Sequence, residues 1–189
     1  MIRFPRVIDV SIRRYGSGEV FSLVRGDSVP SDKRTCDRLV SVCNEPLIYS
    51  SLFRDLFAGR PYSVDDANGW LTWVRDGWLY SSHFAFVVLD DRECIVAACD
   101  IKCAQPENAE IGYWCSATAS GVMSNAARAM IDLAARAGFQ SFIAYTRPGN
   151  VRSEHVLDRL GFSRAESVGA DGRHLHRYHV VQSPLQDCT

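Results

Sequence analysis

The segment from residue 109 to residue 162 constrains the fold of this chain more than any other part of the sequence. Its first residues, 109–115, are apolar and aromatic and are typical of a β-strand. A loop of small residues around Gly121 follows, and a helical pattern then continues up to Gly138, which is placed as a helix C-cap. A strand, a small-residue loop and a helix N-terminus together present backbone N–H groups to an anion. This segment therefore predicts a site for a ligand that carries phosphate groups.

The second half of the segment repeats the alternation of strand and helix. Residues 139–145 are largely apolar and predict a second strand, and the Pro-Gly-Asn sequence at 148–150 predicts a turn. Residues 150–160 have a helical pattern that ends at Gly161. The whole segment is therefore expected to form two consecutive strand–helix units.

The rest of the chain supplies further elements. Residues 7–13 alternate with period two and predict a first strand, whereas Gly16, Gly18 and the polar run at 26–32 indicate loops. Helices are expected at 33–43 with Ser31 or Asp32 as cap, at 47–59, and at 63–77, where Ser63 and Asp66 form a helix-start signal. The remaining strands are expected at 84–89, 94–102, 162–167 and 173–181.

This order of elements predicts the fold class. A three-strand antiparallel meander followed by strand–helix–strand units gives an α/β fold with a mixed, mostly antiparallel sheet of about seven strands and helices on both faces. The 189 residues are enough for one domain with a buried core. We expect that domain to span residues 1–182 and the polar residues 183–189 to form a C-terminal tail.

Composition narrows the range of partners. The formal net charge of -1 gives no electrostatic attraction for nucleic acid or an anionic membrane, and no apolar run approaches the length of about 20 residues that a spanning helix needs. The first ten residues lack the apolar core and cleavage site of a signal peptide. The seven cysteines are scattered and contain no Cys-x-x-Cys pair, which argues against a disulfide framework or a zinc cluster. We therefore expect a cytoplasmic protein that binds neither nucleic acid nor membranes.

Three motifs carry a resemblance to a known family. They are Glu110-Ile-Gly-Tyr-Trp, the helical run at 126–132, and Asn150-Val-Arg-Ser153 followed by the Val-Leu-Asp-Arg-Leu-Gly-Phe run at 156–162. Together they resemble the GNAT N-acetyltransferase superfamily, and within it the branch that acetylates the N-terminal alanine or serine of ribosomal proteins. The resemblance implies the GNAT fold and a direct, acetyl-CoA-dependent transfer of an acetyl group to a primary amine.

The resemblance also implies where acetyl-CoA binds. In the family, one strand of the sheet splays from its neighbour and its exposed backbone pairs with the pantetheine arm, while the following loop and helix hold the pyrophosphate. The positions that match the pantetheine site are Trp114, Cys115 and Ser116, with Asn150 either at the pantetheine amide or as a helix N-cap. The positions that match the pyrophosphate site are Thr118, Ala119, Ser120, Gly121, Val122, Met123 and Ser124.

This pyrophosphate loop departs from the family pattern. The pattern begins with Gln or Arg and contains two small residues, usually Gly, whereas Thr118–Met123 has one glycine and no charge. Backbone amides at a helix N-terminus hold an anion without particular side chains, but a charge-assisted contact is lost. Two alternatives follow. Either Arg128, Arg147 or Arg152 replaces the missing charge, or the chain is a catalytically degenerate binding or interaction module.

Acetyl transfer to an amine needs a general base for the amine and a general acid for the departing CoA thiolate. By resemblance, Glu110 corresponds to a glutamate base of the family's histone-acetylating members, and Ser153 matches a serine that lies near the CoA sulfur. The purely structural alternatives are an ion-paired glutamate at the start of a strand and a hydroxyl in the first turn of a helix.

The acceptor amine would enter beside aromatic residues. Trp70 and Trp73 on one predicted helix, together with Tyr113, are candidates for lining the acceptor pocket, although an aromatic stripe of this kind is also typical of a helix packed on a core. A protein N-terminus, an aminoacyl compound or an antibiotic amine would suit such a pocket. The sequence leaves the acceptor open, and it leaves open whether the chain is a monomer or a homodimer.

Two weaker signals concern other chemistry. Cys115 lies on the expected cofactor strand, but no histidine or aspartate is placed by sequence to activate it as a nucleophile. His174 and His176 share a strand face, but no cysteine or carboxylate completes a zinc site with them. We therefore expect no metal site, and histidines that face solvent or the acceptor.

Overall fold

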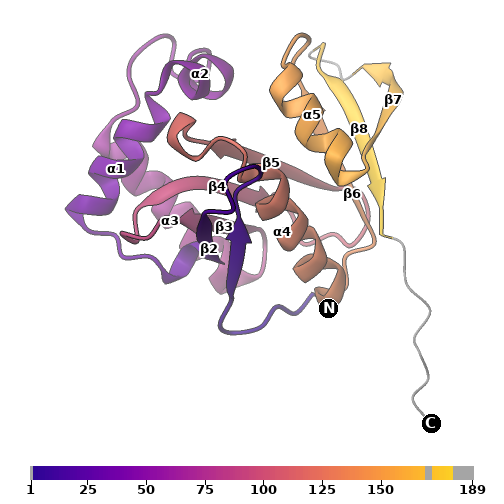
Figure 1. Ribbon diagram of the computed structural model, residues 1–189, viewed down its shortest axis with the longest axis horizontal. Coiled ribbons are helices and arrows are strands. Elements are labelled where there is room, and N and C mark those ends of the chain that lie inside the picture. The colour runs from indigo at the N-terminus through magenta and orange to yellow at the C-terminus, as the bar shows by residue number, and fades with distance from the viewer. Residues whose placement is uncertain (1, 169–171, 181–189) are drawn as a thin grey trace.

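The computed structural model describes residues 2–168 and 172–180 (Figure 1). Its strands are β1 (Asp9–Arg13), β2 (Val20–Arg25), β3 (Phe84–Leu89), β4 (Ile95–Ile101), β5 (Ala109–Cys115), β6 (Ser141–Thr146), β7 (Ser163–Val168) and β8 (His174–His179). Its α-helices are α1 (Lys33–Cys43), α2 (Pro46–Ile48), α3 (Val64–Tyr80), α4 (Met123–Ala137) and α5 (Val151–Leu160). Short 3₁₀ helices lie at Gly26–Ser28 and Ala117–Ala119, and a π-helical turn lies at Tyr49–Phe53. The tail expected at 183–189 falls outside the described residues.

The described strands form one eight-stranded sheet in the order β1-β2-β3-β4-β5-β6-β8-β7. Every neighbouring pair is antiparallel except β5 and β6, which are parallel. Helices α1 and α3 pack on one face of the sheet, and α4 and α5 pack on the other. The predicted fold class, a mixed and mostly antiparallel sheet with helices on both faces, is confirmed.

The extra strand is β2, in a region where the sequence predicted no element. It pairs with β1 on one side and with β3 on the other. Phe21 and Leu23 alternate with more exposed neighbours and are 4% and 0% exposed. The predicted number of strands was too low because this short alternating run stands between two glycine-rich or polar stretches that both indicate loops.

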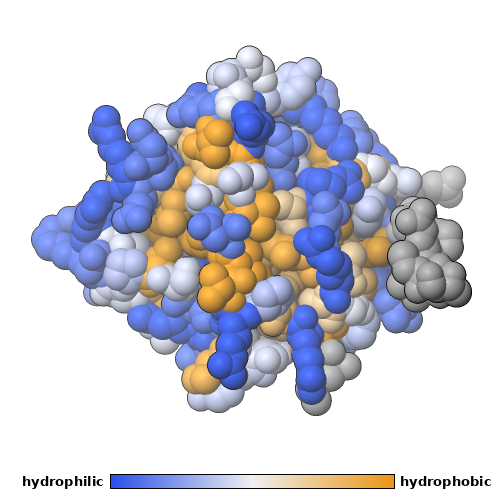
Figure 2. All heavy atoms as spheres, turned by 60° about the horizontal axis from the view of Figure 1, so that its bottom comes forward, coloured by the Kyte–Doolittle hydropathy of each residue, from blue (hydrophilic) through white to orange (hydrophobic). Residues whose placement is uncertain are grey.

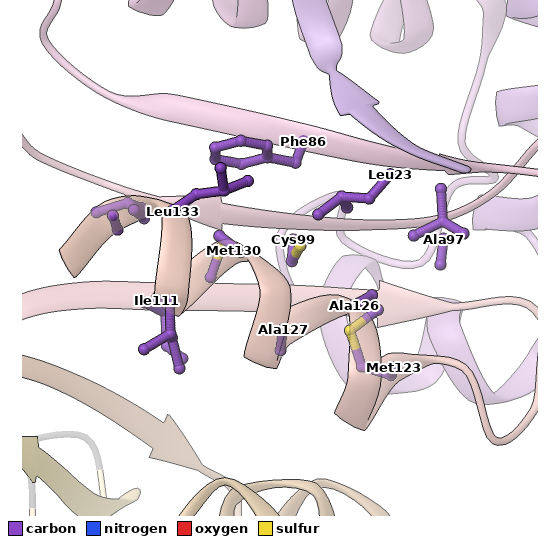
Figure 3. Close-up of a cluster of buried hydrophobic side chains, with 14 of the residues drawn as sticks. Leu23, Phe86, Ala97, Cys99, Ile111, Met123, Ala126, Ala127, Met130 and Leu133 are labelled. Atoms are coloured by element: carbon purple, nitrogen blue, oxygen red, sulfur yellow. The ribbon is translucent and has the colours of Figure 1, made fainter. Parts of the chain in front are cut away.

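Helix α4 closes one face of the sheet (Figure 3). On that face, Phe86 of β3 lies opposite Cys99 of β4, and both are fully buried. The helix presents small and flexible apolar residues at helical spacing, which lets its axis lie close to the strands. The buried residues of α4 are Met123, Ala126, Ala127, Met130, Ile131, Leu133, Ala134 and Ala137.

Helices α1 and α3 close the opposite face with a second apolar cluster. There Val87 of β3 lies opposite Ala98 of β4, and Leu39 of α1 and Leu71 of α3 pack over them. Cys36 and Cys43 belong to the same cluster as small buried side chains. The described cysteines are all free thiols: Cys36, Cys43, Cys94, Cys99, Cys103 and Cys115.

The predicted helix caps are present. Asp32 accepts a 2.8 Å hydrogen bond from the N–H of Thr35, and Ser63 and Asp66 form a reciprocal capping box at the start of α3. Helices α4 and α5 end at Gly138 and Gly161, whose φ angles of 114° and 85° lie in the left-handed region.

Helix α3 continues to Tyr80, beyond the end predicted near Gly77. A Cβ atom on Gly77 would lie 2.4 Å from the ring of His83, so this glycine makes room for a close approach and does not stop the helix. The reversal occurs at Ser81, which has a φ of 52°.

The surface mixes apolar and polar side chains. Figure 2 shows one face on which apolar side chains gather near the centre and hydrophilic side chains surround them. Among the large apolar side chains, Leu79 and Tyr80 at the end of α3 are 72% and 73% exposed. More than half of a folded protein's surface is usually apolar, so such exposure assigns no function by itself. Within 2–168 and 172–180, no helix is long and apolar enough to cross a membrane.

Candidate active site

Strands β5 and β6 begin as a parallel pair and then separate. Only Ala109 with Phe142 and Glu110 with Ile143 are in register. From Ile111 onward, the edge of β5 that faces β6 has no strand partner, so its N–H and C=O groups are available to a ligand. This is the splayed strand that the family resemblance implies.

Two cavities open at this fork. The first, called the loop cavity, has a volume of about 550 Å³ and lies between the end of β5, the loop that follows it, and α5. The second, called the fork cavity, has a volume of about 730 Å³ and lies where β5 and β6 diverge. The predicted cofactor-binding residues that line the loop cavity are Trp114, Cys115, Ser116, Ser120, Gly121, Met123, Ser124, Asn150 and Ser153.

Three predicted cofactor-binding residues do not line it. The Thr118 hydroxyl lies 2.9 Å from the Ser116 hydroxyl, and Ala119 and Val122 are fully buried in the core. Their side chains therefore contribute nothing to the lining of this cavity.

The two cavities meet at Tyr113, Asn150 and Ser153, which line both. The hydroxyl oxygens of Tyr113 and Ser153 lie 2.7 Å apart. Asn150 caps α5 by accepting a 3.2 Å hydrogen bond from the N–H of Ser153, which holds the first turn of the helix in place. Burial raises the pKa of Tyr113 to about 12, so its hydroxyl stays protonated near neutral pH. The junction therefore holds a hydroxyl pair that can donate a proton.

The two tryptophans predicted to line the acceptor pocket lie elsewhere. Side chains alternate along β5, so Trp114 points to the α3 side of the sheet and Tyr113 to the α4 side. Trp70 packs against Trp114 with ring centroids 6.2 Å apart, and Trp73 stacks on His83 at 4.0 Å. Neither tryptophan lines the loop cavity or the fork cavity.

A residue that the sequence did not single out anchors the loop. The carboxylate of Glu45, at the start of α2, accepts hydrogen bonds from the Ser116 hydroxyl at 2.5 Å and from the N–H of Ala117 at 2.7 Å. The hydroxyl of Ser116 is itself buried. No local signal marks Glu45, because its partners are some 70 residues away in the sequence.

The donors left for a ligand are the next amides along the chain. Met123 and Ser124 are the first residues of α4, whose start has no side-chain cap, and both line the loop cavity. The first N–H groups of a helix have no intrahelical acceptor, so these amides are available beside the cavity as donors for an anion.

The arginines expected to replace the missing loop charge have different positions. Arg128 donates to the C=O of Leu160 and to the Tyr178 hydroxyl, and does not line the loop cavity. Arg147 forms a 2.9 Å ion pair with Asp55 at the fork cavity. Arg152 of α5 does line the loop cavity, and so does Arg159, which the sequence did not suggest. The guanidinium of Arg159 also lies 5.4 Å from the ring of Tyr15, another lining residue.

Glu110 lines the fork cavity and is ion-paired. The Nζ of Lys102 lies 2.6 Å from its Oε1, and 30% of the Glu110 side chain is exposed. The ion-paired alternative weighed for this glutamate is therefore present, and it coexists with access to the cavity.

Other reactive groups are less suited to catalysis. Burial raises the pKa of Cys115 to about 12, and its thiol donates a 3.2 Å hydrogen bond to the C=O of Ala119, so it is a poor nucleophile. His176 was expected to face solvent or the acceptor, and this was wrong, because it is 2% exposed and its Nε2 lies 2.9 Å from the Thr146 hydroxyl. Across the described ranges, no group of histidine, cysteine, aspartate and glutamate side chains is arranged to hold a metal ion.

A forked mixed sheet, a small-residue loop leading into a helix, and two cavities that meet at a pair of hydroxyls define an acyltransferase of the GNAT fold class. The chain belongs to the acetyltransferase (GNAT) domain family, whose model matches residues 33–163. No curated protein matches the chain.

Solved structures share this fold at low sequence identity. RimJ of Mycobacterium smegmatis, in complex with CoA-disulfide, is 18% identical over 93% of this chain and 88% of its own, with a TM-score of 0.71. The ribosomal-protein-S5-alanine acetyltransferase of Vibrio fischeri is 18% identical over 90% and 97%, with a TM-score of 0.66. The microcin C7 self-immunity acetyltransferase MccE, in complex with acetyl-CoA and AMP, is 14% identical over 85% and 92%, with a TM-score of 0.67.

Proposed function

We propose that this protein is an acetyl-CoA-dependent N-acetyltransferase that transfers an acetyl group directly to a primary amine. The observation that carries this proposal is the meeting of two cavities at Tyr113 and Ser153, beside the unpaired edge of β5. One cavity holds the cosubstrate and the other the acceptor. The complexes of RimJ with CoA-disulfide and of MccE with acetyl-CoA support this choice of cosubstrate.

In this proposal, the loop cavity holds the CoA moiety. The amides of Met123 and Ser124 bind the pyrophosphate, and Arg152 and Arg159 supply the positive charge that the loop lacks. The pantetheine arm pairs with the free edge of β5 near Trp114.

The chemistry follows from the groups at the junction. The amine nitrogen bonds to the acetyl carbon, and the carbon–sulfur bond of the thioester breaks. The amine proton passes to Glu110 on the wall of the fork cavity, and the departing thiolate takes a proton from the Tyr113–Ser153 hydroxyl pair. No covalent enzyme intermediate is needed, which agrees with the protonated state of Cys115.

The acceptor is a polar amine. The fork cavity is lined by charged side chains and hydroxyls, among them Asp55, Lys102, Glu110, Tyr145 and Arg147. A protein N-terminus, as the name of the Vibrio fischeri relative suggests, and a small-molecule amine both fit a cavity of this polarity.

We further propose a single domain over 1–182, acting in the cytoplasm as a monomer or homodimer, without nucleic acid or membrane partners.

Calorimetry with acetyl-CoA tests the cosubstrate. Replacing both Arg152 and Arg159 by glutamine is expected to weaken acetyl-CoA binding by about tenfold or more, since charge-assisted hydrogen bonds contribute about 1.5–3 kcal/mol. Added salt should weaken binding to the wild type more than to the variant. The matched control is Arg136→Gln, on an exposed position of α4 away from the loop cavity.

Release of free CoA thiol with a panel of amines tests the reaction. Thiol release that depends on a particular amine supports an acetyltransferase. Binding of acetyl-CoA without release of CoA thiol in the presence of any amine would favour the degenerate binding module. A calorimetric titration of folded protein with acetyl-CoA that gives no heat would contradict acetyl-CoA as the cosubstrate.

A further inference from the structure

The turn that joins β1 to β2 is fastened to the loop before α4, and the chemistry above gives this turn no part. The N–H of Tyr15 donates a 3.1 Å hydrogen bond to the C=O of Gly121. The side-chain amide of Asn125, in the first turn of α4, donates a 2.7 Å hydrogen bond to the C=O of Arg13. The turn therefore lies beside the start of α4, as can be followed in Figure 1.

Arg14 fixes the shape of the turn. Its N–H donates a 2.7 Å hydrogen bond to the C=O of Glu19, and its guanidinium forms a 3.1 Å ion pair with the carboxylate of the same residue. The guanidinium also donates to the C=O of Thr118, in the loop that follows β5. The position of Tyr15 is thus set by its own backbone and by its neighbours, and its ring takes no part in fastening the turn.

The ring of Tyr15 lines the loop cavity and is 75% exposed. An exposed tyrosine assigns no function by itself, but this one is held by its backbone beside a guanidinium, because that of Arg159 lies 5.4 Å from its ring centroid. One face of α5 lines the same cavity at the helical spacing i, i+3, i+4, i+7, with Arg152, His155, Val156 and Arg159. This part of the cavity therefore combines an aromatic ring with two cations.

A ring and guanidinium groups of this kind suit a purine nucleotide. Aromatic side chains stack on the planar face of a base, and guanidinium groups bind phosphate oxygens. In CoA the adenosine, which carries a 3′-phosphate, is joined directly to the pyrophosphate. The pyrophosphate is assigned to the amides of Met123 and Ser124, and Gly121, which holds Tyr15, lies two residues before Met123. The base of a bound CoA is therefore within reach of the Tyr15 ring.

We propose that the ring of Tyr15 stacks on the adenine base of CoA, so that the β1–β2 turn recognises the nucleotide half of the cosubstrate. The family model matches residues 33–163, so this turn lies outside the matched region. The inference rests on the proposed use of acetyl-CoA. Tyr15 acts on the affinity for the cosubstrate and takes no part in the transfer of the acetyl group.

Calorimetric titration with acetyl-CoA tests the stacking contact. Tyr15→Ala removes the ring but keeps the N–H that is bonded to Gly121, so it should weaken binding by about tenfold. Tyr15→Phe keeps the ring and should bind like the wild type. The control is Tyr80→Ala, which removes a ring that is 73% exposed at the end of α3 and lines neither the loop cavity nor the fork cavity.

A second titration locates the contact on the nucleotide. Adenosine 3′,5′-bisphosphate carries the base and lacks the pantetheine arm, and its affinity is measured by displacement of acetyl-CoA. Tyr15→Ala should weaken this ligand by the same factor as acetyl-CoA. Stacking is not screened by ions, so the factor should stay constant as salt is added, whereas the loss caused by replacing Arg152 and Arg159 should shrink.

The outcomes separate this inference from the proposed function. Wild-type affinity of Tyr15→Ala for acetyl-CoA, an equal loss in Tyr15→Phe, or undiminished binding of adenosine 3′,5′-bisphosphate by Tyr15→Ala would overturn the stacking contact alone. No heat from folded wild-type protein on titration with acetyl-CoA would overturn the cosubstrate and this inference together.

Discussion

The hydroxyls at the junction of the two cavities are the residues on which the proposed chemistry depends most. Tyr113 and Ser153 lie 2.7 Å apart, and the N–H of Ser153 is held by Asn150. The motif around Ser153 was recognisable in the sequence, but its tyrosine partner was expected at the acceptor. A strand places alternate residues on opposite faces, so one β5 residue contacts α5 while the next contacts Trp70.

Tyr113→Phe tests which hydroxyl protonates the thiolate. The ring remains in its packed position while the proton donor is lost, so kcat should fall by about tenfold to a hundredfold with little change in the KM for acetyl-CoA. Steady-state kinetics by thiol release measures both constants, and Tyr80→Phe, at the exposed end of α3, is the control. If kcat is unchanged in Tyr113→Phe but falls in Ser153→Ala, the hydroxyl of Ser153 is the group that protonates the thiolate.

At the scale of elements, the link between α2 and the loop after β5 couples the two sides of the site. Glu45 holds Ser116 and Ala117, and Ser51 and Leu52, a few residues further on, line both cavities. The segment that borders the fork cavity therefore also positions the loop at the loop cavity.

Glu45→Gln should weaken the binding of acetyl-CoA more than it slows the reaction. Two charge-assisted hydrogen bonds to the loop are replaced by neutral ones, and a loss of about 1.4 kcal/mol corresponds to tenfold in affinity. Titration of acetyl-CoA into the variant measures this loss. Glu107→Gln, on an exposed glutamate of the β4–β5 turn, should bind like the wild type, and a wild-type affinity for Glu45→Gln would contradict the anchoring role.

The capping box at the start of α3 makes the stability of the protein depend on pH through Asp66. Hydrogen bonds from Arg60 and Ser63 lower the pKa of Asp66, so its contribution to stability is present above the unfolded pKa of about 3.9 and is lost as pH falls below it. Asp66→Asn should lower the free energy of unfolding by about 1 kcal/mol at pH 7. Urea denaturation should show that the difference in the free energy of unfolding between Asp66→Asn and the wild type becomes smaller at acid pH. Asp65→Asn, on the exposed neighbour, is the control, and an equal loss there would contradict the cap.

At the scale of the whole molecule, the sheet consists of two parts joined by a short parallel contact. Strands β1 to β5 form one antiparallel part, and β6, β8 and β7 form the other. Two register pairs between β5 and β6 connect them. The candidate site lies where this connection ends, because among the described strands the edge of β5 is left unpaired there, in the interior of the sheet.

Hydrogen exchange should report this architecture. In the ligand-free protein, every second amide in 111–115 faces the fork and should exchange faster than the amides of β4, which have strand partners on both sides. Acetyl-CoA should slow exchange at those amides and at the start of α4. Slow exchange at 111–115 without ligand would contradict an open fork.

Several features of this protein follow from its sequence by itself. The α-helices and strands from Val64 to Leu160 were predicted to within a few residues, because their apolar periodicity, the capping box at Ser63 and the glycines at 138 and 161 act locally. The motif at 150–162 identified the family for the same reason, since it is contiguous in the chain. Strand β2 could have been found from its alternation but was hidden by flanking loop signals.

Only the tertiary structure decided how the site is charged and where its walls are. Glu45 at the start of α2 anchors the loop after β5, and Arg159 of α5 lines the loop cavity beside Tyr15, so both depend on partners distant in the sequence. Burial, strand register and the direction of each side chain set these contacts, and none of them has a local pattern. The sequence determined which fold forms and which segment leads from β5 into α4. Packing decided which charged side chains line the loop cavity and the fork cavity.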